Sequence, residues 1–259
     1  MSDEPLEVTY EIRPAAGERA EDKARDITLE QTVELPGEVV PAAAQAMVGE
    51  IRALEGAGSG VWRARIRFAA DTVGGELPQL LNLLFGNISL KTGLRITAIQ
   101  WPPWLLAGLG GPGHGVAGVR ALTGVADRAL LATALKPMGL SASELAARCR
   151  AFALGGVDLI KDDHGLANQA SAPFAERLAR CQEAVTNANA RTGGHGLYLP
   201  NVTAARPTLQ ARAEAAREAG CQGVLVNPWI AGLDVLAWLR DELGLAVMAH
   251  PALTGGLFA

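Results

Sequence analysis

The sequence predicts an α/β protein with an N-terminal α+β domain of the ferredoxin-like type, residues 1–110, and part of a (β/α)8 TIM barrel, residues 111–259. Three observations support this. The first hundred residues mix strand and helix patterns. A stretch rich in glycine and proline, residues 101–118, then reads as a linker. Beyond it, apolar strands alternate strictly with amphipathic helices, the pattern of repeated βα units.

In the N-terminal domain, residues 61–68 give the clearest strand. Arg63, Arg65 and Arg67 fall on one face, and apolar residues fall on the other. The other elements follow from alternating or helical spacing of apolar residues. The expected strands are 7–13, 27–35, 61–68 and 94–100, and the expected helices are 41–54 and 77–85.

The second domain is predicted to contain five strands joined by four helices. The strands are 128–137, 157–163, 196–202, 223–228 and 245–252, and the helices are 141–154, 173–193, 208–220 and 233–244. Ser141 and Glu144 form a capping box at one helix start, and Gly220 ends another helix. The strands are apolar throughout, as expected when both faces are buried. Neither the dinucleotide-binding nor the P-loop glycine motif occurs, which disfavours both functions.

The composition is that of an ordinary globular protein, with 49% hydrophobic and 19% charged residues. A net charge of −4 and the lack of a basic run argue against nucleic acid as a partner. Three cysteines at spacings that fit no ligand pair indicate a reducing compartment. The N-terminus lacks a signal-peptide pattern, and no apolar run reaches the ~20 residues of a membrane span. We expect a cytoplasmic protein without membrane partners.

Polar residues follow every predicted strand of the second domain. They are Lys136; Lys161, Asp162, Asp163 and His164; Asn201 and Thr203; Asn227; and His250. Barrel enzymes build their sites at this rim, so the pattern favours a barrel over a doubly wound sheet. Solvent exposure alone could explain one polar strand end, but five with this chemistry indicate a site.

The segment GGVDLIKDDHG, residues 155–165, is the most informative of these strand ends. Strand alternation places Lys161 and Asp163 on the same side, toward the barrel mouth. A lysine beside carboxylates is usually an ion pair. A lysine that reacts with carbon dioxide instead becomes an anionic carbamate, which together with Asp163 would bind a hard cation such as Mg²⁺.

Seven sequence blocks resemble the large subunit of RuBisCO, and more closely the RuBisCO-like proteins (form IV), which share its fold without fixing carbon. The blocks are EQTVELP (30–36), the GN of LFGNIS (84–89), GPGHGV (111–116), LKPMGLS (135–141), GGVDLIKDDHG (155–165), PNVTA (200–204) and MAHPA (248–252). They occur in the family's order and span nearly the whole chain. The pair KP-x-GLS and GG-x-D-x-x-KDD is the most specific part of the match.

The resemblance implies a Mg²⁺ site in which Lys161, carbamylated by carbon dioxide, and Asp163 are ligands. The third ligand position is glutamate in RuBisCO but is His164 here. Imidazole suits transition metals better than Mg²⁺. His164 is therefore expected to weaken Mg²⁺ binding, to hold the ion through water, or to act as an acid or base.

The resemblance also implies the other site residues. Lys136 corresponds to the proton-abstracting base, and His250 to a histidine of the same site. Asn87 corresponds to an asparagine that reaches the metal site of the partner subunit, which implies a homodimer with a shared active site. Lys91 is a weaker candidate from the same loop. Asn201 and His114 are expected to contact substrate.

Several departures disfavour carbon fixation. Met138 replaces a second lysine, and Pro251 replaces a phosphate-binding arginine. No glutamate-threonine-tryptophan stretch occurs near residues 58–62. The expected function is metal-assisted enolisation or isomerisation of a phosphorylated ketose, of the 5-methylthioribulose 1-phosphate type used in methionine salvage.

Two alternatives remain from the sequence. One is decarboxylation of a phosphorylated 3-oxo acid, and the other is a non-catalytic or fragmentary RuBisCO-like protein with a binding or regulatory role. The second arises because a closed barrel needs eight strands and the sequence predicts about five. A fragment of a longer protein or a truncated reading frame is expected over an eroded relative.

Overall fold

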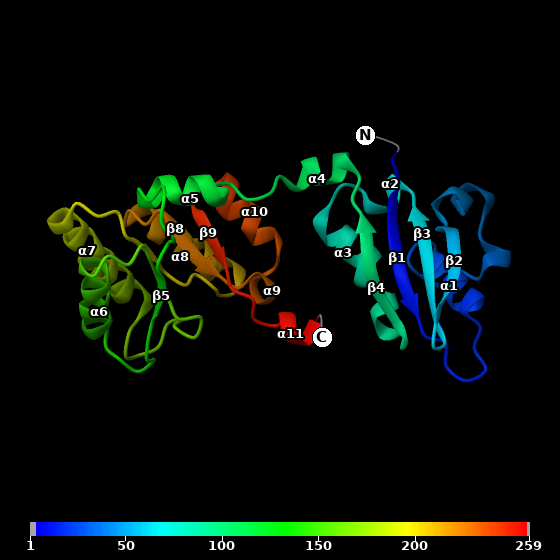
Figure 1. The fold of residues 1–259 in the computed structure, drawn as a ribbon, viewed down its shortest axis with the longest axis horizontal. Helices are drawn as coiled ribbons and strands as arrows, with labels where there is room; N and C mark the ends of the chain where they lie inside the picture. Colours follow the sequence, from blue (N-terminus) through cyan, green and yellow to red (C-terminus); the bar gives the residue numbers. More distant parts are fainter. Residues whose placement is uncertain (1–3, 258–259) are drawn as a thin grey trace. The chain divides into compact units, whose positions relative to one another are not determined.

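The computed structural model describes residues 4–257. The chain divides into two compact units, the first ending at Gly111 and the second beginning at Pro112 (Figure 1). Each unit has its own hydrophobic core.

The first unit is an antiparallel sheet covered by helices, with the strand order β2-β3-β1-β4 (Figure 1). The strands are β1 (Leu6–Ile12), β2 (Glu50–Gly58), β3 (Val61–Phe68) and β4 (Leu94–Gln100). The helices are α1 (Ala20–Glu30), α2 (Ala70–Val73) and α3 (Leu77–Phe85), with 3-10 turns η1 (Gly37–Val39), η2 (Ala42–Met47) and η3 (Asn87–Leu90). This element order and sheet order are those of a ferredoxin-like domain, as predicted.

The two faces of this sheet have opposite polarity. Alternate residues of β1, among them Val8 and Ile12, are buried against α1 and α3. Arg63 and Arg65 of β3 lie on the opposite, exposed face, where Arg65 pairs with Glu7 of the neighbouring strand. The alternation read from the sequence of residues 61–68 is confirmed.

Two predictions in the first unit were wrong. Residues 27–35, expected as a strand, begin inside helix α1, whose buried face repeats at Ala20, Ala24 and Ile27. The first part of this helix is mostly polar, so its helical spacing was not recognised and only the alternation of residues 27–35 was read. Residues 41–54, expected as a helix, form η2 and then strand β2. Gly49 lies between them. The backbone passes close to its neighbours there, since an added Cβ would meet the Phe68 ring and the Thr28 backbone at 3.0 and 3.2 Å.

The second unit contains five parallel strands in chain order. They are β5 (Ala132–Leu135), β6 (Leu159–Asp162), β7 (Leu197–Leu199), β8 (Gly223–Val226) and β9 (Ala246–Ala249). Strands β5-β6-β7 and β8-β9 pair directly, and a parallel bridge from Asn201 to Leu225 joins the two groups. The five predicted strands are all present, and they form part of a TIM barrel.

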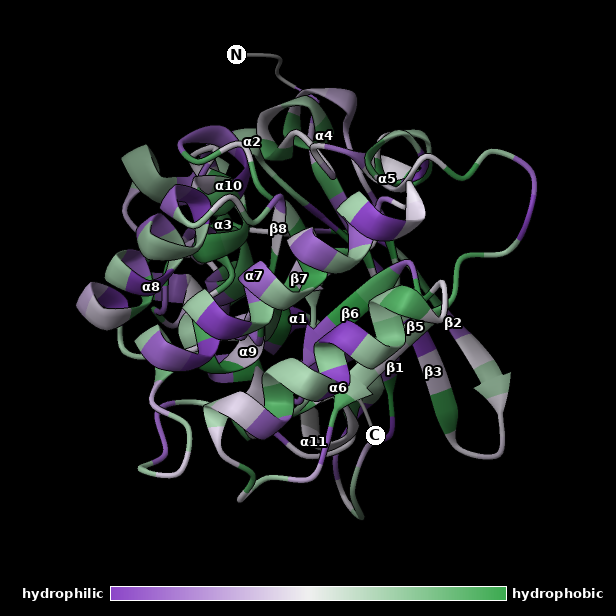
Figure 2. Ribbon diagram, turned by 90° about the vertical axis from the view of Figure 1, so that its left-hand side faces the viewer, coloured by the Kyte–Doolittle hydropathy of each residue, from purple (hydrophilic) through white to green (hydrophobic). Residues whose placement is uncertain are grey.

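Helices connect these strands and bury apolar stripes against them. They are α6 (Ala142–Leu154), α7 (Phe174–Thr192), α8 (Arg206–Glu218), α9 (Pro228–Ala231) and α10 (Asp234–Asp241), and the short helix α11 (Thr254–Leu257) follows β9. The predicted capping box is present, since the Glu144 N–H donates to Ser141 Oγ and the Ser141 N–H donates to Glu144. Hydrophilic and hydrophobic bands alternate along α7, as an amphipathic covering helix requires (Figure 2).

The region predicted as a linker is partly helical. It contains α4 (Pro103–Leu109) and the start of α5 (Gly115–Thr123). Proline does not prevent α4, because it occupies the first turn of this helix, where its missing N–H is not needed. Within residues 4–257, no helix is long and apolar enough to cross a membrane.

Candidate active site at the carboxyl ends of the parallel strands

Strands β5 and β6 bring Lys136 and Asp163 together at their carboxyl ends. Lys136 Nζ lies 3.4 Å from Asp163 Oδ1, and His164 Nδ1 lies 3.6 Å from the same oxygen. Lys136 directly follows β5, and Asp163 directly follows β6. The two strands pair in parallel, so their carboxyl ends lie side by side. The Lys136 side chain is 67% exposed, and its amine is accessible to a ligand.

Lys161 lies in β6, near Asp163, which follows the strand, and the charge of Asp163 acts on the Lys161 amine. Its Nζ donates to the Asp162 carbonyl oxygen at 3.1 Å. Burial lowers the pKa of Lys161, and the positive charge of Lys136 lowers it further, although Asp163 opposes both. The amine is therefore neutral more often than that of an ordinary lysine.

Asp163 is the anionic centre of this cluster. Burial by itself raises the pKa of Asp163, but the Gly165 N–H, His164 and Lys136 outweigh it, and the pKa lies below its usual range. The Gly165 N–H donates to Asp163 Oδ2 at 3.2 Å. Asp163 is thus ionised at neutral pH and can receive a cation.

His250 reaches the same cluster from the end of β9. Its ring stacks on His164, with centroids 4.3 Å apart. The Ala252 N–H donates to His250 Nδ1 at 3.2 Å, which leaves the proton of the neutral ring on Nε2. Burial lowers the pKa of His250, and the charges of His164 and Lys161 lower it further. His250 is therefore a neutral ring that presents an N–H donor.

Asn201 lies beneath this cluster at the end of β7, with its side chain occupied. Both donated bonds of Nδ2 go to backbone carbonyls, of His164 at 2.9 Å and of Leu166 at 3.0 Å, and Oδ1 accepts the Thr203 N–H. The residue is 2% exposed. These contacts favour a role in holding the loop after β6 over direct contact with substrate.

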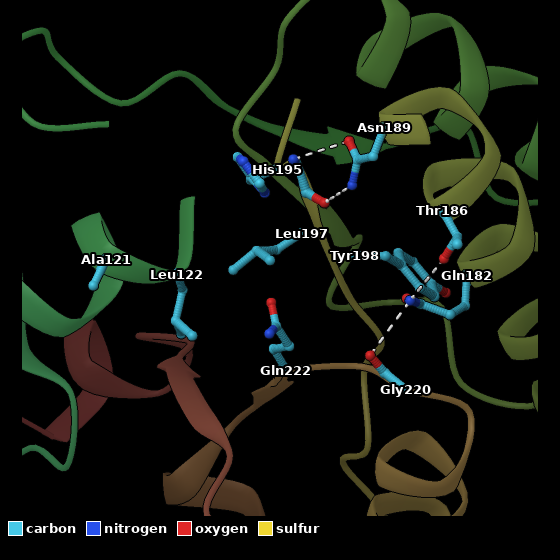
Figure 3. Close-up of a pocket in the computed structure, with 11 residues that line it drawn as sticks. Ala121, Leu122, Gln182, Thr186, Asn189, His195, Leu197, Tyr198, Gly220 and Gln222 are labelled. Carbon is cyan, nitrogen blue, oxygen red and sulfur yellow. Dashed lines mark hydrogen bonds between the residues drawn. The ribbon is translucent and has the colours of Figure 1, made fainter. Parts of the chain in front are cut away.

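None of the contacts given above joins His114 to the rim cluster around Asp163, so its expected contact with substrate stays a prediction. His114 begins α5, which lies at the opposite end of the strands from α11 and the rim (Figure 1). Leu122 of α5 lines a cavity of about 440 Å³ at the amino ends of β7 and β8, where Leu197 and Gln222 face the same space (Figure 3). Sequence proximity to a motif did not reveal which end of the strands the helix covers.

Asn87 and Lys91 lie in the first unit, where they form a separate polar cluster. Asn87 Nδ2 donates to Glu30 Oε1 at 3.1 Å, and Lys91 pairs with Glu30 at 3.3 Å and with Asp26. Glu30 was missed as a partner because residues 27–35 were assigned to a strand. The first residue of EQTVELP is this glutamate, so the motif carried the signal.

A second group missed from the sequence surrounds Asp162. This carboxylate is fully buried and bonded by Arg177 of α7 and Tyr198 of β7. The available signal was Arg177 itself, which interrupts the apolar stripe of α7 between Phe174 and Leu178. An arginine on the buried face of a helix implies a buried acidic partner.

The metal-binding chemistry of the cluster depends on Lys161. Among residues 4–257, no three His, Cys, Asp or Glu side chains gather in a way that could hold a metal ion. Asp163 supplies one carboxylate and His164 one imidazole, and a protonated Lys161 is not a ligand. A carbamate on Lys161 would replace a positive charge with an anionic oxygen donor, after which Lys161 and Asp163 fit a hard cation.

Comparisons with known proteins give a consistent result. Residues 115–255 match the model of the ribulose bisphosphate carboxylase large chain, catalytic domain. The chain is 40% identical over 254 residues to a 5-methylthioribulose-1-phosphate isomerase of Rhodospirillum rubrum, covering 96% of this chain and 68% of that protein. It is 36% identical over 185 residues to a 2,3-diketo-5-methylthiopentyl-1-phosphate enolase of Bacillus licheniformis, covering 70% of this chain and 46% of the enolase.

The fold has a close counterpart among solved structures. The crystal structure of a Rubisco-like protein from Rhodopseudomonas palustris matches with a TM-score of 0.89 and 42% identity, covering 98% of this chain and 71% of that chain. The chain thus spans about two thirds of the length of two such proteins, and less than half of the enolase.

Proposed function

This chain belongs to the RuBisCO large-chain family as a RuBisCO-like protein, and on that premise we propose that it enolises a phosphorylated ketose without fixing carbon. The observation that carries the proposal is the rim cluster, in which Lys136 lies 3.4 Å from Asp163 beside a Lys161 of lowered pKa. The preferred substrate is 5-methylthioribulose 1-phosphate, a metabolite of methionine salvage, because the isomerase relative acts on it by name.

Lys136 is the proposed base. Its neutral amine would take the proton from the carbon beside the ketose carbonyl, and the C–H electron pair would form the enediolate. Returning a proton to a neighbouring carbon completes an isomerisation without any change in oxidation level. Asp163 lies close enough to orient the lysine amine, and an oriented acid or base contributes typically 10²–10⁴-fold to a rate.

His250 is the proposed donor to a substrate oxygen. Its Nδ1 already accepts the Ala252 N–H, so the neutral ring offers Nε2–H. A donor placed where negative charge develops stabilises the enediolate more than the ketone. Since burial lowers the pKa of His250, the ring can donate this bond without becoming charged.

Lys161 and Asp163 are the proposed ligands of Mg²⁺, with Lys161 carbamylated. When bound, the ion would polarise the carbonyl and acidify the adjacent C–H. The lowered pKa of Lys161 supports the proposal, since carbon dioxide adds to a neutral amine and not to an ammonium ion. The proposed assembly is a homodimer in which Asn87 of one subunit completes the site of the other.

The test follows proton exchange by NMR, with 5-methylthioribulose 1-phosphate in D₂O, Mg²⁺ and bicarbonate. We expect loss of the substrate C3 proton signal, and product signals that distinguish isomerisation from enolisation of a diketone. Lys136→Met and Lys161→Ala should slow exchange by about 10²-fold or more. Lys23→Met is the matched control, because Lys23 is a lysine of the first unit paired with Glu18.

Two outcomes contradict the proposal. One is the absence of exchange with wild-type protein, which would favour a non-catalytic role. The other is exchange that Lys136→Met leaves within threefold of wild type, which would remove Lys136 as the base.

A further inference from the structure

Asp162 lies between two proposed site residues but faces the opposite way. Lys161 and Asp163 are partly exposed, whereas the Asp162 carboxylate has no exposed surface and is bonded by Arg177 of α7. Arg177 Nε donates to Asp162 Oδ2 at 3.1 Å, and Tyr198 Oη donates to Oδ1 at 2.8 Å. The Asn201 N–H donates to Oδ2 at 2.9 Å.

Arg177 also bonds the loop that follows β6. We call residues 163–172 the rim loop, since it carries Asp163 and His164. The Arg177 side chain is fully buried, and it donates to the Ala172 carbonyl at 2.8 Å and to the Ala167 carbonyl at 3.0 Å. One guanidinium thus ties the end of β6 to two separate points of the loop.

Further side chains bond the carbonyls between the end of β6 and Ala167. Asn201 Nδ2 donates to the carbonyls of His164 and Leu166. Gln169 Nε2 donates to the Gly165 carbonyl at 2.8 Å, and its Oε1 accepts the Ala167 N–H at 2.9 Å. Four consecutive carbonyls, from His164 to Ala167, therefore each accept a side-chain hydrogen bond.

We propose that Asp162, Arg177 and Asn201 are positioning residues, which fix the rim loop so that Asp163 and His164 keep their places beside Lys136. The catalytic consequence rests on the proposed function, but the positioning does not. None of the three needs to touch substrate. Arg177 and Asn201 bond backbone carbonyls of the loop, and Asp162 holds the Arg177 guanidinium and the Asn201 N–H in place. A displacement of about 1 Å in a catalytic group can lower a rate about 10²-fold.

Stability alone is a weak reason for this pair. Fully buried ion pairs recover little more than their desolvation cost, and well-packed apolar residues often serve as well. The planar guanidinium supplies what an apolar residue or a lysine cannot, namely donors in fixed directions to one carboxylate and two carbonyls.

The other end of β6 provides an internal comparison. There Arg128 donates to both oxygens of buried Asp158 at 2.7 Å, and the Leu131 N–H donates to the same carboxylate. This pair fastens the start of β6, and its hydrogen bonds given above involve no residue of the rim loop. A change at Arg128 therefore tests strand anchoring without loop positioning.

The experiment compares Arg177→Lys with Arg128→Lys in the full chain. Amide hydrogen exchange of the rim loop should rise about tenfold or more in R177K and remain unchanged in R128K. In the enolisation assay, R177K should lower kcat about tenfold or more, with KM within threefold. Tyr198→Phe removes the single hydrogen bond that the tyrosine hydroxyl donates to Asp162. It should shift both loop exchange and kcat in the same direction as R177K, by a smaller factor.

Unchanged loop exchange in both R177K and Tyr198→Phe would overturn the proposal. So would a faster-exchanging loop with wild-type kcat. If wild-type protein fails to enolise the substrate, the proposed function fails, and the exchange comparison still decides the positioning role.

Discussion

The rings of His164 and His250 stack, with centroids 4.3 Å apart and planes inclined by 18°. The two residues come from the ends of β6 and β9, which are not neighbours in the sheet. The family resemblance implies a glutamate ligand at the position of His164. In the proposed Mg²⁺ site the ring stack would therefore stand where a carboxylate ligand is expected.

We predict that His164→Glu strengthens Mg²⁺ binding, because it adds an oxygen donor and a negative charge beside Asp163. With bicarbonate present, Mg²⁺ should raise the Tm of this variant more than that of wild type, by mass action. His195→Glu is the control, since His195 lines the cavity at the amino ends of the strands. An equal or smaller Tm rise in His164→Glu would contradict the prediction.

Carbamate formation on Lys161 should depend on pH in a defined direction. An ordinary lysine has a pKa of about 10.4. Burial lowers the pKa of Lys161, so its neutral amine appears at lower pH. Uptake of ¹³C-bicarbonate, followed by NMR, should rise with pH and begin below the range of an ordinary lysine. Lys161→Arg should abolish the signal. A carbamate signal that survives in Lys161→Arg would assign it elsewhere.

Asp158 is predicted to stabilise the second unit above acidic pH. Its hydrogen bonds from Arg128 hold the pKa of Asp158 below the usual value, although burial opposes them. This stability is present above the unfolded pKa, about 3.9, and is lost as pH falls through the folded pKa. Asp158→Asn should lower the free energy of unfolding by about 1–3 kcal/mol at pH 7.

Urea denaturation at pH 7 and pH 3 checks this prediction. The difference between wild type and Asp158→Asn should shrink at pH 3, because the carboxylate of the unfolded state, with a pKa of about 3.9, is then largely protonated. A difference that is equal at both pH values would show that charge on Asp158 contributes nothing.

Two tyrosines should respond oppositely to loss of the hydroxyl. Tyr10 is 1% exposed, and within the described part of the chain its hydroxyl has no hydrogen-bond partner. Tyr10→Phe should therefore raise the free energy of unfolding by about 1 kcal/mol. Tyr198→Phe removes a bond to a charged group and should lower it by about 1–3 kcal/mol. Urea denaturation of both variants measures the two changes in the free energy of unfolding. Changes of the same sign would contradict the prediction.

Local patterns determined much of the fold. The strict alternation after residue 128, the capping box at Ser141 and the arginine face of residues 61–68 were readable because each depends on neighbours a few residues away. The same limit explains the errors at residues 27–35 and 41–54. There, helix α1 and strand β2 are decided by packing against β3 and by the close approach at Gly49.

By itself, the sequence determined the family resemblance and the grouping of Lys136, Lys161, Asp163, His164 and His250 at strand ends, since parallel strands align their carboxyl ends. Only the tertiary structure decided that Asp162 turns away to Arg177, that Asn201 holds the rim loop, and that His114 lies at the other end of the strands. Those relationships join residues far apart in the chain, and no local spacing encodes which helix covers which end of a sheet.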